Sequence, residues 1–550
     1  MKKSLRFISL ALAATVAAGS MTACGSGGKA ETGKKTNDAP TQSFPLKEKV
    51  TFKFLTHEPT YASQDLNQRL IAQRLEKGTG VHIEWTTYVD DQFGDKKKLA
   101  LAKKTGLPDA IFDAQMSNYD LLHYSKQGVI IPLNDYIKKY MPNLNKIMNE
   151  NPKYRAAVTA PDGHIYSFPW IEELGSEKGV IQAVGAIPWI NKKWLDQLGL
   201  SIPKTTDDLE KALLAFKEKK PAGKNTIPMS FRINKINEDP GVLLGAFGKG
   251  DTSDHYMVDD NGKVFYSLTQ DGYKNGINWM HKLYQDGVID PEVFTQDDGT
   301  YISKAQGNRI GLFFSWDREN MASKNVNDYI ALPALTGPDG TKNVPRANAI
   351  GGLEVGRMVV TSADHNPALT AKWVDELYKP QQSIQDNWGT YGDTKNDNIF
   401  EMSGNMLKHL TIKSGVAPYE LRMKTNLSGP LAVLNSYYGK YSTMPSDAEA
   451  RIKVINDTYV PDMKAKNIYP PVFMDMDTTN RITQIETDLV SYAEGRKAEW
   501  LMKGGADAQW NEYLGKMNSL GLPELLQLKQ KGYDSYTQNQ NGSSSSTTTK

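Results

Sequence analysis

The 550-residue chain carries 65 basic and 63 acidic side chains, a net charge of +2, and 39% hydrophobic residues. This composition excludes a disordered polymer, and the balanced charge excludes the basic surface typical of nucleic-acid-binding proteins. The length is enough for two or more folded domains. The single cysteine, Cys24, has no partner in the chain, so an internal disulfide is excluded.

The first residues predict a secretory signal. A basic stretch ends at Arg6, an apolar run follows over residues 7–18, and small residues then lead to Cys24. The apolar run is shorter than the roughly 20 residues of a membrane span. We therefore expect cleavage, with residues 1–23 as a signal peptide.

The residues Met21-Thr-Ala-Cys24 resemble a bacterial lipobox, although Met21 stands where leucine is usual. The resemblance implies that Cys24 receives a diacylglyceryl group and anchors the protein in the cell membrane, facing outward; two acyl chains hold a protein stably. The alternative is a small residue that happens to lie at a cleavage site. Residues 24–43 are rich in Gly, Lys, Thr and Ser and predict a flexible tether.

The folded body begins with alternating strands and helices. Residues 50–56 alternate apolar and polar side chains like a strand, residues 66–75 have helical spacing, and residues 81–85 predict a second strand. A lysine-rich helix around 96–104 and a short apolar strand over 107–112 follow. This order is typical of an α/β lobe.

A second α/β series starts further along the chain. Residues 186–191 predict a strand, and residues 194–198 and 205–219 predict helices, the latter capped by a threonine. Before it, Pro161-Asp-Gly-His164 predicts a tight turn. No repeat of fixed period appears, so the pattern favours two α/β lobes over a solenoid or propeller.

Motifs for catalysis and metal binding are missing from the sequence. The eight histidines form no His-Glu-x-x-His pair, no phosphate-binding Gly-Lys-Ser/Thr loop occurs, and no Gly-x-Ser-x-Gly elbow is present. We therefore expect no metal, no cofactor and no catalytic residue. Adjacent carboxylates such as Glu172-Glu173 keep a secreted glycoside hydrolase open as an alternative.

Four segments resemble the extracellular solute-binding proteins of ABC importers. They begin at Asn191-Lys-Lys-Trp-Leu-Asp-Gln-Leu-Gly-Leu, Pro161-Asp-Gly-His-Ile-Tyr, Tyr378-Lys-Pro-Gln-Gln-Ser and Ala508-Gln-Trp-Asn-Glu-Tyr. With the lipobox they span the whole chain. They point to the large, lipid-anchored subset of Gram-positive bacteria that is associated with oligosaccharides.

The resemblance implies a two-lobed α/β fold of the periplasmic-binding-protein type II, with the ligand held in the cleft between the lobes. It also implies a monomer that binds an oligosaccharide and is recognised by the permease subunits of the transporter. We assign the N-terminal lobe to residues 44–168 plus about 336–395, the C-terminal lobe to 169–335 plus about 396–536, and a disordered tail to 537–550.

A sugar cleft needs aromatic rings beside hydrogen-bonding groups, because pyranose rings expose both C–H faces and hydroxyls. In open α/β sheets such groups lie beyond the carboxyl ends of strands. The residues that meet these conditions are Trp170, Glu172, Trp316, Asp317, Arg318, Trp388, Tyr391, His57, Glu58 and Asp113, with Glu354 and Arg357 as weaker candidates.

Two further expectations concern the ligand. A binding protein for peptides or another non-sugar solute stays open, because the same fold serves many solutes. Some relatives carry an acidic, EF-hand-like calcium loop after the helix that corresponds to residues 205–219. Here the stretch Lys220-Pro-Ala-Gly-Lys-Asn-Thr-Ile-Pro228 has no carboxylate, so we expect no calcium at this loop.

Overall fold

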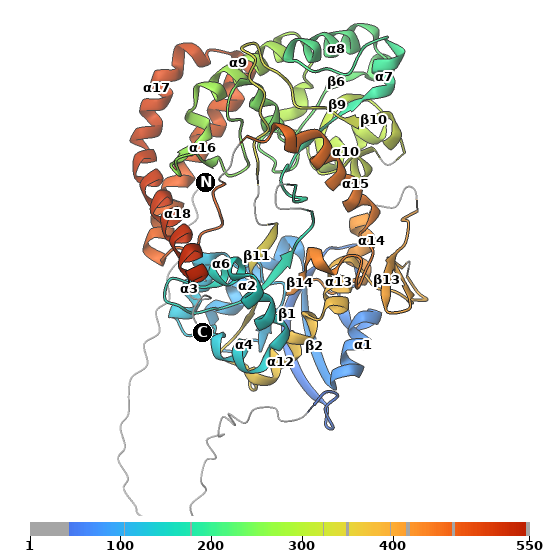
Figure 1. Cartoon of the computed structure of the whole chain (residues 1–550), viewed down its shortest axis with the longest axis vertical. Helices are drawn as coiled ribbons and strands as arrows, with labels where there is room; N and C mark the ends of the chain where they lie inside the picture. Colours follow the sequence, from blue (N-terminus) through green and yellow to red (C-terminus); the bar gives the residue numbers. More distant parts are fainter. Residues whose placement is uncertain are drawn as a thin grey trace, which may run out of the picture. The chain divides into compact units, whose positions relative to one another are not determined.

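The computed structural model describes residues 43–545, apart from 104, 176–178, 323, 348–350, 397, 414–417 and 465–467. The predicted signal peptide, Cys24 and the predicted tether up to residue 42 lie outside the described residues. Two separate sheets, each with its own buried core, organise the rest of the chain (Figure 1). We call the elements around them the first lobe and the second lobe.

A six-stranded mixed sheet forms the centre of the first lobe. Its strands, in spatial order, are β14 (Leu431–Val433), β4 (Phe168–Glu172), β11 (Gly352–Val360), β3 (Ala110–Ile111), β1 (Val50–Glu58) and β2 (Val81–Val89). All run parallel except β11, which pairs antiparallel with β3 and β4. The carboxyl ends of β1, β2, β3 and β4 therefore meet at one edge, which we call the carboxyl edge.

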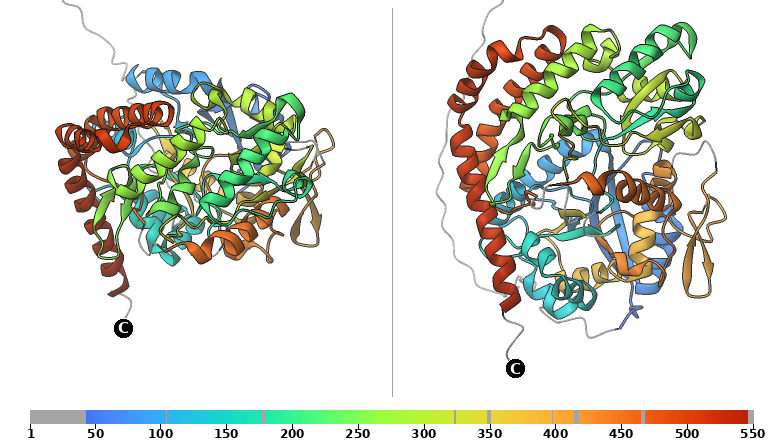
Figure 2. Two further views of the ribbon diagram at one scale, coloured as in Figure 1. Left: turned by 90° about the horizontal axis from the view of Figure 1, so that it is seen from above. Right: turned by 45° about the horizontal axis from the view of Figure 1, so that its top comes forward.

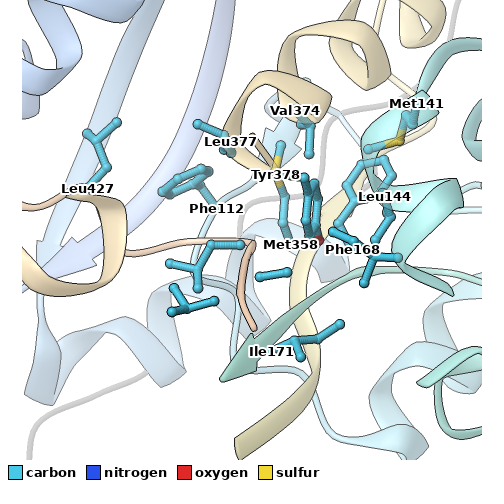
Figure 3. Close-up of a cluster of buried hydrophobic side chains, with 14 of the residues drawn as sticks. Phe112, Met141, Leu144, Phe168, Ile171, Met358, Val374, Leu377, Tyr378 and Leu427 are labelled. Atoms are coloured by element: carbon cyan, nitrogen blue, oxygen red, sulfur yellow. The ribbon is translucent and has the colours of Figure 1, made fainter. Parts of the chain in front are cut away.

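Both faces of this sheet are buried. Along β1, Phe52 and Phe54 enter one hydrophobic cluster and Leu55 enters the other, as the alternation in the sequence predicts. Phe112 and Tyr378 approach Met358 of β11 in the larger cluster (Figure 3). Each such side chain contributes about 1.5–3 kcal/mol when it is buried.

Helices and one hairpin cover the first sheet. They are α1 (Leu70–Thr79), α2 (Asp90–Lys103), α3 (Asn118–Lys126), α4 (Asn134–Tyr140), α5 (Pro142–Glu150), α6 (Pro152–Val158), α12 (Pro367–Leu377), α13 (Pro380–Trp388) and α14 (Pro418–Thr425), with the hairpin β12 (Phe400–Ser403) and β13 (Met406–His409).

A four-stranded sheet forms the centre of the second lobe. Its order is β10 (Tyr329–Ala331), β5 (Ile187–Asn191), β9 (Ile310–Ser315) and β6 (Ile227–Met229). Strand β9 is buried at every position, with Phe314 and Phe313 in different clusters. Around this sheet lie α7 (Lys192–Gln197), α8 (Thr206–Lys219), α9 (Asp271–Gln285), α10 (Asp298–Gln306), α11 (Arg318–Ala322) and the hairpin β7 (Tyr256–Val258) and β8 (Val264–Tyr266).

The predicted helix over 205–219 is α8, and its start has a clear local cause. The Thr205 side chain accepts a hydrogen bond from the backbone of Asp208, while the Asp208 side chain accepts one from the backbone of Thr205. This capping box satisfies two backbone donors that a helix start leaves unpaired. Lys220 then ends the helix in a left-handed conformation, with φ of 50°.

The C-terminal part consists of α15 (Ser446–Val454), α16 (Met476–Lys503), α17 (Ala506–Ser519) and α18 (Leu522–Ser545). Figure 2 shows α16, α17 and α18, in red, lying next to one another. Helix α16 packs against α9 and α18, and α18 also packs against α6 of the first lobe. Residues 537–545, which we expected to be disordered, continue α18 as helix; residues 546–550 lie outside the described residues.

The lobe boundary near residue 395 also differs from the expected one. Strand β14 pairs with β4 in the first sheet, and Phe400, Leu421 and Tyr437 are buried in the first lobe's core. The segment from about 399 to 448 thus belongs to the first lobe, where we expected the second. Its partner strand lies far away in the sequence, and local patterns carry no record of such pairing.

Candidate ligand-binding site

Four polar side chains meet at the carboxyl edge of the first sheet and form the edge cluster: His57, Asp90, Asp113 and Arg357. The His57 Nδ1 atom lies 2.7 Å from an Asp90 carboxylate oxygen, and its Nε2 atom lies 3.7 Å from Asp113. Asp113 also pairs with Arg357 at 2.9 Å. Asp113 adopts a left-handed backbone conformation, φ 49°, which is costly for a residue with a side chain and is often found at functional sites.

The edge cluster keeps its imidazole protonated at neutral pH. Burial by itself lowers the pKa of His57, but hydrogen bonds and charges from Asp113 and Asp90 outweigh burial and raise the pKa to about 8. For Asp113, burial acts in the opposite direction and raises the pKa. The charges of Arg357 and His57 outweigh burial and hold the pKa of Asp113 below its usual range. The cluster therefore contains two cations and two carboxylates.

The raised pKa of His57 predicts a pH-dependent stability. The folded protein binds this proton more tightly than the unfolded chain, so the stabilisation is complete below about pH 6.5 and is lost as the pH rises through about 8. A shift of this size corresponds to about 2 kcal/mol. In unfolding titrations from about pH 6 to about pH 9, we expect the stability difference between wild type and His57→Gln to shrink by this amount. A difference that stays constant with pH would contradict the assignment.

Glu58, a predicted ligand contact, is instead fully enclosed. Its carboxylate pairs with Arg69 at 3.0 and 2.6 Å, and both side chains are only 2% exposed. Arg69 also donates to the Asn426 carbonyl at 2.8 Å, across 357 positions of sequence. Glu58 therefore holds the end of α14 onto β1 and is not accessible to a ligand.

A second group of polar and aromatic side chains gathers where the chain leaves β4. Asn387 of α13 donates to the Glu172 carboxylate at 2.6 Å and accepts a hydrogen bond from the Trp170 indole at 3.2 Å. Gln182 donates to the other Glu172 oxygen at 3.4 Å. Burial raises the pKa of Glu172, while Asn387 and the Arg422 charge act against it.

The Trp170 ring also explains a glycine in β11. A Cβ atom on Gly352 would lie 2.4 Å from the indole, closer than any carbon–carbon contact allows. Gly352 pairs with Glu172 in the neighbouring strand, so the missing side chain leaves room for the ring beside the carboxylate. Gly352 thus serves this packing, whereas a Cβ atom on Gly351 would lie 2.8 Å from the Glu172 carbonyl oxygen.

Trp316 follows β9 of the second lobe and lies beneath the guanidinium of Arg451. The guanidinium carbon is 3.5 Å from the ring centroid. Arg451, 4% exposed, donates to the carbonyls of Ile181, Val184 and Trp316. Burial lowers the pKa of Arg451 to about 9, and the Asp317 charge opposes that shift. A single arginine of α15 thus joins the segment after β4 to the end of β9.

Arg422 of α14 interacts electrostatically with both the Glu172 group and the Trp316–Asp317 group. Burial lowers the pKa of Arg422, and the charges of Asp447, Glu172 and Asp317 oppose that shift. Arg422 pairs directly with Asp447 at 2.8 Å. We define the crossing cluster as Trp170, Glu172, Asn387, Trp316, Asp317, Arg422 and Arg451.

A cavity of about 620 Å³ opens beside the crossing cluster. Trp316 and Gln182 form part of its wall, and the exposed Ile236 forms another part. Charged pairs of the second lobe also line it, with Lys497 bound to Asp239 at 2.7 Å and His255 bound to Asp251 at 2.8 Å. The wall therefore offers one aromatic ring, apolar surface, and both hydrogen-bond donors and acceptors.

Three predicted residues lie apart from these clusters or are covered. The Tyr391 ring stacks under Arg74, whose guanidinium carbon is 4.2 Å from the ring centroid. Arg318 donates to the carbonyl of Tyr329 in the second lobe. Trp388 is 3% exposed, and Arg422 covers one face of its ring at 3.8 Å. Trp388 is therefore covered, whereas Arg318 and Tyr391 are half-buried.

Several site residues escaped sequence reasoning. Arg422 and Arg451 lie on helices whose sequences carry no motif, and the hydrogen-bond partners of Arg451 lie 135 to 270 positions away in the chain. Asn387 lies in the segment that starts at Tyr378, but nothing local marks it as a partner of Glu172. Asp90 directly follows β2, but the predicted strand ended at residue 85, so the rule that sites lie beyond strand ends did not select it.

One group in the described part of the chain has the composition of a metal site. Ligand atoms of Asp109, Asp364 and His365 lie within 4.8 Å of one another. Asp109 already accepts hydrogen bonds from the backbone of Lys53 at 2.7 Å and from the His365 ring at 3.1 Å. This group precedes β3 and lies at the opposite end of that strand from the edge cluster.

Comparison with known proteins places the chain among transport proteins. Residues 63–384 match the model of the bacterial extracellular solute-binding proteins. The fructooligosaccharide ABC transporter substrate-binding protein FusA of Streptococcus pneumoniae is 47% identical over 531 residues, covering 95% of this chain and 96% of FusA. Among the described residues, none of the helices combines the length and apolarity needed to span a bilayer.

Solved structures agree with this comparison. FusA in complex with kestose, and a FusA EF-hand mutant in complex with fructo-nystose, each share 48% identity, cover 89% of this chain and 100% of the solved chain, and give a TM-score of 0.85. An HMO-binding solute-binding protein of Bifidobacterium longum infantis is 25% identical, covers 89% of this chain and 99% of its own, and gives a TM-score of 0.75. The two-lobed α/β fold is thereby confirmed.

Proposed function

Because the chain belongs to the bacterial extracellular solute-binding proteins, we propose that it captures a fructooligosaccharide outside the membrane and delivers it to the permease of an ABC importer. Similarity to FusA extends over nearly the whole of both chains, so the ligand-binding parts are included. The relatives compared above are described as binding proteins. We propose accordingly that this chain also binds its ligand without chemical change.

The crossing cluster beside the 620 Å³ cavity carries this proposal. Trp316 in the cavity wall supplies an aromatic face for the C–H surface of a sugar ring, and Gln182 in the same wall supplies an amide for hydroxyls. Glu172 adjoins this wall through its hydrogen bond with Gln182. A cavity of this size lies within the range of small-molecule sites. The mixed, nearly balanced charges suit a neutral polyol better than an ion.

The extent of the polar surface favours an oligosaccharide over a single sugar. The crossing cluster begins at β4, and the edge cluster extends from Arg357 on the neighbouring β11 to His57 after β1 and Asp90 after β2. The sheet order separates β4 from β1 by three strand spacings, which is about 14 Å. One sugar ring does not span that distance, whereas a chain of several rings does.

The origin of the site residues supports ligand-driven closure. Trp316 and Asp317 follow a strand of the second lobe, whereas Trp170, Glu172 and Arg422 belong to the first. A ligand that contacts both sets gains more free energy in the closed arrangement, so it shifts the population toward that arrangement. We propose that the permease distinguishes the closed, loaded form from the open one.

Membrane attachment through Cys24 belongs to the same proposal. The lipobox-like residues before it and the family's extracellular location support a lipid anchor. In cells, we expect Cys24→Ala to move the protein from the membrane fraction to the medium. Equal membrane retention of wild type and Cys24→Ala would refute the anchor.

Isothermal titration of residues 44–550 tests the ligand class. We expect binding of kestose and nystose, with weaker binding of sucrose and none of maltotriose or a tripeptide. Product analysis after long incubation should show the sugars intact. Binding of the tripeptide with silence for all sugars would overturn the proposal, and the appearance of free monosaccharides would favour a hydrolase.

A further inference from the structure

Helix α15 is anchored in the cores of both lobes. Ala448, in its first turn, is buried in the main core of the first lobe. Ile455, directly after its last residue, is buried together with Phe313 of β9 in a core of the second lobe. Because close-packed side chains hold both ends of the helix, the residues between them have a fixed place relative to each lobe.

Two charged side chains on one face of α15 reach the crossing cluster. Asp447 and Arg451 are four positions apart, so they are neighbours on the helix surface. Asp447 pairs with Arg422 of the first lobe at 2.8 Å. The Arg451 guanidinium lies 3.5 Å from the centroid of the Trp316 ring, which follows β9 of the second lobe and packs against the core of the first. The helix therefore contacts members of the crossing cluster from both lobes.

The guanidinium of Arg451 joins two separate parts of the cavity wall. It donates to the Trp316 carbonyl and also to three carbonyls of the segment after β4, namely Ile181 at 3.1 Å, Val184, and Gly185 at 3.4 Å. Trp316, Val184 and Gly185 all line the 620 Å³ cavity. Arg451 is 4% exposed and is not one of the described residues that line this cavity, so it supports the wall from outside the lining.

The shape of the guanidinium explains why an arginine occupies this position. Its planar fork carries five donors, so one side chain reaches several carbonyls and still stacks on a ring. These hydrogen bonds offset the cost of burying the charge. A lysine would keep the charge, but its ammonium is a compact group without the planar fork. We therefore expect lysine to be a poor substitute here.

We propose that Arg451 is a positioning residue for the sugar site: it holds the Trp316 ring and the segment 181–185 in their binding arrangement before a ligand arrives. The inference rests on the proposed function, because it concerns the same cavity. A preformed wall avoids the entropy cost of ordering the wall when the sugar binds. Loss of Arg451 therefore weakens binding although this side chain lies outside the cavity lining.

Calorimetric titration with kestose tests this role. For Arg451→Lys we expect the affinity to fall by about tenfold, because lysine cannot hold both parts of the wall. If Arg451 acts through Trp316, the double variant Trp316→Ala/Arg451→Lys should lose far less than the roughly three-hundredfold that independent effects of about thirtyfold and tenfold would give. Lys453→Met, at an exposed position of the same helix, should bind kestose like wild type.

Hydrogen exchange tests whether the wall is preformed. The amides of Ile181 and Ala183 donate to the carbonyls of Leu174 and Val180 at 2.8 Å each. In wild type we expect these amides to exchange slowly both without and with kestose. In Arg451→Lys they should exchange faster without the sugar and regain protection with it, while the amides of β1 and β2 stay unchanged. A general loss of stability would instead accelerate exchange in β1 and β2 as well.

The outcomes separate the positioning role from the general function. Wild type that binds no fructooligosaccharide would refute the proposed function. Wild type that binds kestose, with Arg451→Lys of equal affinity or with fully additive losses in the double variant, would refute the positioning role alone. If Arg451→Lys does not fold, wild-type exchange decides: protection of Ile181 and Ala183 that develops only with kestose would overturn the preformed wall.

Discussion

Replacing Trp316 with alanine is expected to weaken fructooligosaccharide binding by about thirtyfold or more, which corresponds to about 2 kcal/mol. Arg451 covers one face of this ring, at 3.5 Å from the centroid, and the residue lines the 620 Å³ cavity. A ring backed by a buried cation and open to a cavity is the type of residue that dominates binding energy. Titration calorimetry with kestose measures the effect.

Trp316→Phe is the matched control, because it keeps an aromatic face at the same position. We expect it to retain most of the affinity, while Trp316→Leu should resemble alanine in spite of its apolar volume. Equal affinities for wild type and Trp316→Ala would show that the sugar does not stack here. The Trp316→Ala protein must also unfold at a temperature close to that of wild type for the comparison to hold.

Arg69→Met is expected to lower the free energy of unfolding by about 3–5 kcal/mol. Glu58, only 2% exposed, would then keep a buried carboxylate without its partner, and the Asn426 carbonyl would lose a donor. Burial already raises the pKa of Glu58, with Arg69 as the main opposing charge. Chemical unfolding measures the loss.

Two controls isolate the unpaired charge. The double variant Glu58→Leu/Arg69→Met removes both charges, and we expect it to recover most of the lost stability. Lowering the pH should relieve Arg69→Met alone, because a protonated Glu58 carries no charge to bury. A single variant as stable as wild type, or a double variant less stable than the single, would contradict this account of the pair.

Trp316 and the Glu58–Arg69 pair have different roles. Trp316 contacts the proposed ligand, whereas Glu58 and Arg69 keep α14 in place for ligand contacts made by other side chains. His57, Asp90, Asp113, Arg357 and Arg422 all have partners of opposite charge, whereas Glu172 is bound by amides and Arg451 by backbone carbonyls. Such paired networks position side chains at low net charge, which suits an uncharged sugar.

Local sequence patterns were sufficient for much of the fold. The alternation over 50–56 and the apolar run before Asp113 predicted β1 and β3, and a threonine cap predicted the start of α8. The rule that ligands bind beyond strand ends selected His57, Asp113 and Trp316, and the structure places all of them in the two clusters. These features depend on residues close together in the chain.

Whether a predicted residue is open or covered depended on distant partners. In the sequence, Glu58 has the same kind of position after a strand as Asp113, and Trp388 is an aromatic candidate like Trp316. In the structure, however, Arg69 encloses Glu58 and Arg422 covers Trp388. The lobe boundary failed for the same reason, because β14 pairs with a strand about 260 positions earlier. Neither pairing leaves a local trace.

The sequence by itself determined the class of this protein: α/β lobes, a lipobox-like cysteine, and aromatic residues beside polar ones at strand ends. Hydrophobic period and short motifs are local properties, so they survive in the linear chain. Only the tertiary structure decided which side chains face a ligand, because exposure is set by what packs on top. Arg451, Arg422 and α14 reach the site from the last third of the chain, and the packing of α14 brings Lys424 within 6.0 Å of the Tyr61 ring centroid.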